Sequence, residues 1–156
     1  MIELLEQEKA NKKLCEELPF LIQMNRNSNE KLDYKYTELD DECPRGWTKL
    51  KLDFYREIKS LLIKANYLDK FRISQSKEKY GYWHLYTCGI PEEISKEYYE
   101  ILKKYENLSE KTCIFCGEEA KMVDTGWISP ICKKCWDKGY ISDTRSYEEV
   151  IVKENE

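Results

Sequence analysis

Four cysteines close to the C-terminal end constrain the fold of this chain more than any other feature. They form two Cys-x-x-Cys pairs and are Cys113, Cys116, Cys132 and Cys135. Two cysteines three positions apart can direct both sulfur atoms toward one ion, and two such pairs complete a tetrahedron of thiolates around zinc. The spacing between the pairs also falls inside the template of known zinc sites. We therefore expect residues 112–140 to form a zinc-binding segment that holds one structural zinc ion.

Three other roles for these cysteines are weaker. Disulfides are unexpected because the number of cysteines is odd and the N-terminal sequence has no secretion signal. A thioredoxin-like redox pair needs a single Cys-x-x-Cys on a βαβ unit, whereas this chain has two pairs and no such unit. A zinc deaminase needs Cys-x-Glu followed by Pro-Cys-x-x-Cys, and Cys116-Gly117-Glu118 with Cys132 and Cys135 comes close. However, Pro130 lies one residue too early, and Cys113 would fill the position that a catalytic water needs. We therefore expect no catalysis at this zinc site.

The composition predicts one small domain with a heavily charged surface. Of the 156 residues, 41% are hydrophobic and 36% are charged, and the formal net charge is −4. An acidic chain is a poor general ligand for nucleic acid. Five lysines around the cysteines are therefore expected to offset the negative charge of the zinc–thiolate site. They are Lys111, Lys121, Lys133, Lys134 and Lys138. No run approaches the ~18 apolar residues of a membrane span, so we expect a cytoplasmic protein without a membrane partner.

Hydrophobic periodicity predicts two long amphipathic helices. In residues 47–65, apolar side chains recur at steps of three and four, which places them on one helical face. A second helix follows Pro91, a residue that suits the first turn of a helix, and its apolar face runs from Ile94 to Leu108. Residues 1–24 favour a further, irregular helix.

Alternating side chains predict a small antiparallel sheet. Residues 71–75 and 82–88 have the alternation and the aromatic content of two strands, with residues 76–81 as the loop between them. We also expect a short strand over residues 34–37 and a final edge strand over residues 150–152. Together these patterns predict an α+β fold in which two long helices pack on the sheet and a zinc knuckle follows at the C-terminal end.

An acidic cluster lies in the predicted loop before the first long helix. It consists of Glu38, Asp40, Asp41 and Glu42. Clustered carboxylates can hold a divalent metal ion, which would support an enzyme. More commonly, such a cluster is a solvated loop whose charge favours the positive N-terminal end of the following helix. Both interpretations remain open.

The tip of the predicted hairpin is a second candidate interaction site. Lys77, Lys79, Tyr80 and Tyr82 bring basic and aromatic side chains together, and such side chains can stack on bases or contact a protein. The alternative is a solvated turn in which Gly81 supplies a positive φ.

Four further residues have no assigned role. Cys15 and Cys88 are expected to be small buried hydrophobic residues, and Cys43 lies in a loop where it can be exposed. His84, the single histidine of the chain, lies on a predicted strand and points away from its two sequence neighbours. We expect a packed or surface histidine rather than a catalytic one.

Three segments carry a resemblance to a known family. Gly46-Trp47 opens the first long helix, residues 75–81 have the sequence QSKEKYG, and the cysteine segment runs Thr-Cys-x-x-Cys-Gly, Gly126-Trp127 and Cys-x-x-Cys. In this combination the chain resembles a family of small, uncharacterised proteins encoded by bacteriophages and prophages. The resemblance extends over residues 45–136.

This resemblance implies a phage origin and no known activity. Small phage proteins often act by binding a host protein, and blocking a defence nuclease such as a CRISPR nuclease is one such role. In the family a basic residue stands where this chain has His84, which weakens an anion-binding role for that strand. We therefore expect a non-enzymatic interaction protein with a host protein as its partner. The alternatives are a nucleic-acid-binding regulatory protein that uses the zinc-segment lysines and the hairpin tip, and an enzyme that uses residues 38–42.

These observations divide the chain into three parts. Residues 1–111 are expected to form the α+β core, in which residues 1–44 diverge from the family. Residues 112–140 form the zinc-binding segment, and residues 141–156 form a tail or an edge strand.

Overall fold

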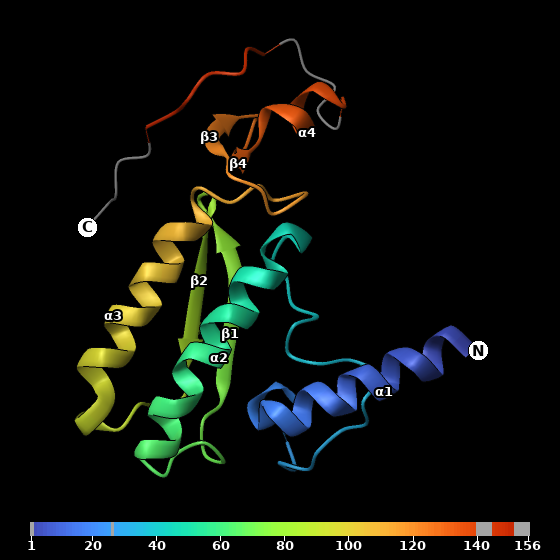
Figure 1. The fold of residues 1–156 in the computed structure, drawn as a ribbon, viewed down its shortest axis with the longest axis vertical. Helices are drawn as coiled ribbons and strands as arrows, with labels where there is room; N and C mark the ends of the chain where they lie inside the picture. Colours follow the sequence, from blue (N-terminus) through green and yellow to red (C-terminus); the bar gives the residue numbers. More distant parts are fainter. Residues whose placement is uncertain (1, 26, 140–144, 152–156) are drawn as a thin grey trace.

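The computed structural model describes residues 2–25, 27–139 and 145–151 (Figure 1). These residues form helices and two separate two-stranded antiparallel sheets, so the predicted α+β class is confirmed. The helices are α1 (Ile2–Glu17), α2 (Thr48–Lys64), α3 (Glu92–Ser109) and the short α4 (Lys133–Asp137), with 3-10 turns at Pro19–Leu21 and Arg45–Trp47. The strands are β1 (Ile73–Lys79), β2 (Tyr82–Thr87), β3 (Lys121–Asp124) and β4 (Ile128–Ile131). None of the described helices is long and apolar enough to cross a membrane.

The main core is aromatic and lies where α2, α3 and the β1–β2 hairpin meet (Figure 1). The ring of Phe54 on α2 packs edge-on against Trp83 of β2 at a centroid distance of 5.3 Å and against Tyr98 of α3 at 6.1 Å. All three side chains are fully buried. Such edge-to-face pairs contribute about 0.5–1.5 kcal/mol each beyond the burial of their area. The predicted apolar faces of both helices therefore build this core.

The β1–β2 hairpin is tighter than its sequence predicts. Lys79 pairs with Tyr82, so the turn contains two residues, Tyr80 and Gly81, with φ angles of 56° and 83°. Two consecutive positive φ angles are typical of a type I′ turn, whose twist matches that of the flanking strands. The prediction of a loop over residues 76–81 is therefore wrong. Strand β1 continues to Lys79 although its sequence is polar. Its buried residue, Ser76, faces the core, and the Ser76 hydroxyl accepts a hydrogen bond from the indole of Trp83 at 2.9 Å.

The segment between α1 and α2 packs on the core without forming a strand. Phe20 is buried against Tyr55 and Phe71, with centroid distances of 5.3 and 4.9 Å. The predicted strand over residues 34–37 is wrong: this stretch has one isolated bridge, between Thr37 and Ile22. The side-chain amide of the buried Asn11 donates instead to the carbonyls of residues 34 and 35, at 2.8 and 3.3 Å. A side chain thus satisfies backbone groups that a neighbouring strand would otherwise satisfy.

The C-terminal stretch also differs from its prediction. Val150 and Ile151 are not in a strand, and Val152 lies outside the described residues. One backbone hydrogen bond of 2.8 Å, from Val150 N to Met122 O, joins this stretch to β3. Tyr147 adds a second contact, from its hydroxyl to the carbonyl of Ile131 at 2.6 Å.

The cysteines outside the C-terminal group have three different environments. Cys15 is buried, as predicted, with 7% of its surface exposed. Cys88, predicted to be buried, is exposed because it follows the end of β2. Cys43 is half-buried and lies 3.5 Å from the hydroxyl of Ser76, and burial raises the pKa of its thiol to about 12.

Candidate metal centre

The four cysteines of the two Cys-x-x-Cys pairs come together in space, as their spacing predicts. Their sulfur atoms all lie within 4.8 Å of one another, and the Cys116 and Cys132 sulfurs are 3.5 Å apart. A tetrahedral site with metal–sulfur distances near 2.3 Å has edges of about 3.8 Å, so the observed spacing fits a bound ion. Three of the cysteines are buried and Cys116 is exposed. The group can therefore hold a metal ion, with one thiolate at the surface.

The first pair forms a tight knuckle after α3. The amide of Cys113 donates to Glu118 O at 2.8 Å, and the amide of Gly117 donates back to Cys113 O at 3.0 Å. Gly117 has a φ of 79°, which a residue with a side chain adopts only at a cost. The amide of Glu118 then points at the Cys116 sulfur, at 3.4 Å. Burial raises the pKa of Cys113, but hydrogen bonds from the backbone around it outweigh burial and lower this pKa to about 7.

The second pair lies at the start of the short helix α4. Cys132 is the N-cap residue, and its sulfur accepts a hydrogen bond from the amide of Cys135 at 3.4 Å. Cys132 O also accepts from the amide of Trp136 at 2.9 Å. Amides that point at sulfur favour the thiolate, which is the form that binds metal. Each pair thus contains a sulfur atom that accepts a backbone hydrogen bond, at Cys116 and at Cys132. Burial nevertheless raises the pKa of Cys116, and that of Cys135 to about 12.

Two glycines allow the cysteine segment to dock on the start of α2. Gly46 N donates to Ile114 O at 2.9 Å, and a Cβ on Gly46 would lie 2.1 Å from Cys113 O. A Cβ on Gly117 would lie 2.8 Å from Gly46 O. Next to this contact, the buried indole of Trp47 donates to the carbonyl of Thr112 at 2.9 Å. The sequence marks Gly46-Trp47 as the opening of a helix but does not show that this helix contacts the cysteine segment.

The hairpin tip packs against the other side of the cysteine segment. A Cβ on Gly81 would lie 2.6 Å from the Met122 sulfur of β3 and 3.0 Å from the carbonyl of Ile128 in β4. The indole of Trp127 donates to the carboxylate of Glu78 at 3.1 Å. Gly81 therefore has two roles, in the turn and in this close contact. Tyr80 remains 57% exposed at the tip.

Two of the five lysines near the cysteines contact Tyr147 of the C-terminal stretch. The Lys121 ammonium lies 4.2 Å from the centroid of the Tyr147 ring, and the Lys133 ammonium lies 5.4 Å from it. Lys133 also forms an ion pair with Asp137 at 2.9 Å. These contacts involve a tyrosine ring and a carboxylate rather than the cysteine sulfurs, so the role of the lysines in offsetting the thiolate charge stays a prediction.

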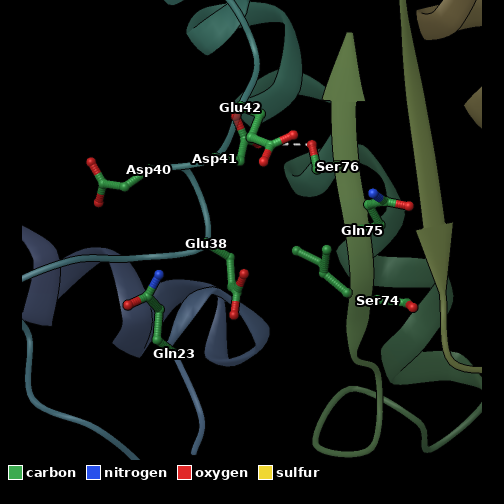
Figure 2. A pocket seen from close by; sticks show the side chains of 9 residues that line it. Gln23, Glu38, Asp40, Asp41, Glu42, Ser74, Gln75 and Ser76 are labelled. Carbon is green, nitrogen blue, oxygen red and sulfur yellow. Dashed lines mark hydrogen bonds between the residues drawn. The ribbon is translucent and has the colours of Figure 1, made fainter. Parts of the chain in front are cut away.

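The predicted acidic loop lines a groove of about 570 Å³ beside β1 (Figure 2). Residues 73–76 form the opposite wall, and Gln23 closes one end. Asp41 has a structural role, because both of its carboxylate oxygens lie 2.8 Å from the ammonium of Lys51, which is 1% exposed. The Ser76 hydroxyl donates to the same carboxylate at 2.7 Å. Sequence reasoning missed this pair, although Lys51 occupies a core-facing position of α2.

The other acidic residues of the loop also line the groove, although the carboxylate of Asp40 points away from β1 (Figure 2). Glu38, Asp40 and Glu42 line it together with Asp41. Asp40 also accepts a hydrogen bond from the amide of Thr37 at 2.7 Å, which fixes the local turn. Among the described residues, the four cysteines are the one group of three or more potential ligands whose atoms converge. The acidic loop therefore presents separate charges along a groove.

Neither known protein families, nor curated proteins, nor solved structures include a match for this chain. A functional assignment therefore depends on the chemistry of the sites themselves.

Proposed function

We propose that this chain is a non-enzymatic interaction protein of phage or mobile-element origin, stabilised by one zinc ion and directed at a host protein. Four sulfur donors in a tetrahedral arrangement select zinc or an iron–sulfur cluster, and spacing and size favour a single zinc ion. With four thiolates as ligands, the ion has no open position for a water molecule or a substrate. The metal then serves the fold, and the function lies elsewhere on the surface.

The acidic groove is the observation that carries the choice of partner. Two of its carboxylates are held in place, Asp41 by the buried Lys51 and Asp40 by the amide of Thr37, so part of the acidic loop is preorganised for a basic partner surface. A basic nucleic-acid channel of a host defence nuclease, such as a CRISPR nuclease, has the complementary charge. Complementary charge accelerates association and selects the partner. Occupying such a channel would inhibit the nuclease without any chemical step.

Affinity capture with matched variants tests this proposal. The zinc-loaded protein is tagged, incubated with host lysate and compared with a double variant of the groove, Glu38→Gln with Glu42→Gln. We expect one host protein at stoichiometric level, lost in the groove variant and at higher salt. A control variant with the same charge change on the exposed surface of α3, Glu97→Gln with Glu100→Gln, should retain the partner. Capture that is absent, or equal in all three proteins, contradicts the proposal.

A further inference from the structure

The β1–β2 hairpin has a second face that the core does not cover. Trp83 and Leu85 of β2 point inward and are at most 5% exposed. Because side chains alternate along a strand, the remaining positions point outward on the opposite side. We call this the outer face of the hairpin. It consists of Gln75, Lys77 and Lys79 on β1, paired respectively with Tyr86, His84 and Tyr82 on β2.

Ring contacts confirm that these side chains share one surface. The rings of Tyr82 and His84 lie 4.0 Å apart at an interplanar angle of 37°. The ammonium of Lys77 lies 5.7 Å from the ring centroid of Tyr86, which is 50% exposed. Lys79 is exposed and lies beside the tip. Three flat rings thus follow one another along β2, with two ammonium groups on the neighbouring strand.

The middle ring of this row is a neutral imidazole. Its Nε2 lies 3.1 Å from the carbonyl oxygen of Lys79, which only accepts, so Nε2 carries the hydrogen. The pKa of His84 is lowered, mainly by burial and also by the charges of Lys79 and Lys77. The contact with Lys79 O and the charge of Glu78 raise this pKa, but by less. At neutral pH the row therefore offers three uncharged rings as a stacking surface.

We propose that the outer face binds single-stranded nucleic acid, with bases stacked on Tyr82, His84 and Tyr86 and phosphates near Lys77 and Lys79. Proteins bind single strands by combining aromatic stacking platforms with basic side chains, and sheet-borne aromatics commonly stack two or three bases. None of the six side chains is a carboxylate or an aliphatic group. Protein interfaces are enriched in tyrosine but depleted in lysine, so it is the two lysines beside the rings that favour an anionic, flat ligand.

The placement of the acidic groove sets the path of the strand. The acidic groove borders β1 at residues 73–76. Its carboxylates repel phosphates from that edge of the hairpin, so the bound nucleic acid follows β2. Because only two lysines contact phosphates, stacking of bases on the rings supplies most of the affinity for the nucleic acid. This inference goes beyond the proposed function and does not rest on it, because the groove and the outer face have only Gln75 in common.

Fluorescence anisotropy with full-length, zinc-loaded protein tests the inference. The probes are labelled oligouridine and oligothymidine of about ten nucleotides, and a duplex of the same length serves as comparison. We expect both single strands to bind more tightly than the duplex, and tighter binding of oligouridine would identify RNA as the preferred form. Tyr86→Ala should weaken binding about tenfold, while Tyr86→Phe should retain it because the ring remains.

Two controls separate stacking from general effects. Tyr36→Ala removes a tyrosine of similar exposure, 53%, that lies away from this face, and it should leave binding unchanged. Replacing Lys77 and Lys79 by glutamine should reduce the slope of log affinity against log salt by about 1.4, as expected for two phosphate contacts. Folding of each variant is verified by circular dichroism.

Three outcomes would overturn the inference. They are the absence of binding to either single strand at low salt, equal binding of duplex and single strands, and unchanged binding by a folded Tyr86→Ala variant. If the Tyr86→Ala variant instead loses the captured host protein while oligonucleotides do not bind, the outer face is a protein interface and the inference is wrong.

Discussion

The two cores of this chain reach stability by different means. The larger core, around α2, α3 and the first hairpin, buries large aromatic side chains such as Phe54 and Trp83 completely. The smaller core, around the cysteines, buries Val123 and Ile131 and little other apolar material. A core of that size does not offset the conformational entropy of the segment that it orders. The comparison therefore teaches that the large core depends on packing, whereas the small one needs a further source of stability, which the proposed zinc ion would supply.

The two cores share a boundary that is unusually close. Gly46, in the 3-10 turn before α2, meets Gly117 and the carbonyl of Cys113, and Ile114 packs against both cores. The sharpest tests of the comparison change one core, or this boundary, and then measure the other.

Loss of a metal ligand should have the largest effect. Cys113→Ser, or chelation of the wild-type protein, should unfold residues 112–139, because structural zinc contributes on the order of 10 kcal/mol to the folding of small zinc domains. Metal analysis should give one zinc per wild-type chain, and amide hydrogen exchange should show loss of protection in this segment while the middle of α2 stays protected. Cys88→Ser, an exposed cysteine outside the group, is the matched control. A fully folded protein without metal contradicts the proposal of a structural zinc ion.

Truncation of the central aromatic residue should have the next largest effect. Phe54→Ala removes a fully buried ring that contacts four other aromatic side chains. We expect a loss of about 3–5 kcal/mol in the free energy of unfolding, from lost burial and the remaining cavity. In a urea titration of this variant, the helical signal should decrease before a chromophoric chelator detects released zinc. Simultaneous loss of both signals would show that the two cores unfold as one unit.

The parts of this structure that the sequence predicts are those that depend on local spacing. The four cysteines lie within 23 residues of one another, and their template fixes the ligand set before any tertiary contact is known. The apolar faces of α2 and α3 follow from helical periodicity in the same way. Each of these patterns is contained in one short segment, so a distant segment does not alter it.

The features that the sequence does not predict depend on contacts between distant segments. Lys51 is buried because Asp41 reaches it from the preceding loop. The polar strand β1 is stable because the hydroxyl of Ser76 contacts Trp83 and Asp41. Gly81 at the hairpin tip is buried because β3 and β4 pack on it, although Tyr80 beside it stays exposed. In each case a polar or small residue has a specific partner that composition and periodicity do not identify.

A small change at the boundary should couple the two cores. Gly46→Ala places a methyl group on the backbone of residues 113 and 114, where no side chain can move aside. We expect a loss of about 1–3 kcal/mol in the free energy of unfolding, as for overpacked sites, with weaker zinc retention although no ligand is altered. Gly89→Ala is the control, because its Cβ would meet only the Tyr67 hydroxyl at an ordinary contact distance of 3.8 Å, so its cost comes from a positive φ. If the Gly46 variant keeps wild-type zinc retention in a chelator competition, the boundary does not couple the two cores.

The smallest expected effect concerns the carboxyl of Glu106 on α3, beside the edge of β2. Burial raises the pKa of Glu106 from its ordinary value of 4.5 to about 7, more than a hydrogen bond with the backbone of Leu85 lowers it. The folded protein therefore holds this proton more tightly than the unfolded chain does. The resulting stability is fully present below about pH 4.5 and is lost as the pH rises to about 7.

Thermal unfolding of the zinc-loaded protein between pH 5 and pH 8 measures this loss. We expect Tm to fall by about 2–4 °C over this range in the wild type. Glu106→Gln should remove this fall, because glutamine cannot ionise, whereas the exposed control Glu100→Gln should keep it. Since Glu106 belongs to the large core, the pH dependence should persist in the Gly46→Ala variant. A wild-type Tm that is constant or rises over this range would show that Glu106 does not link the large core to pH.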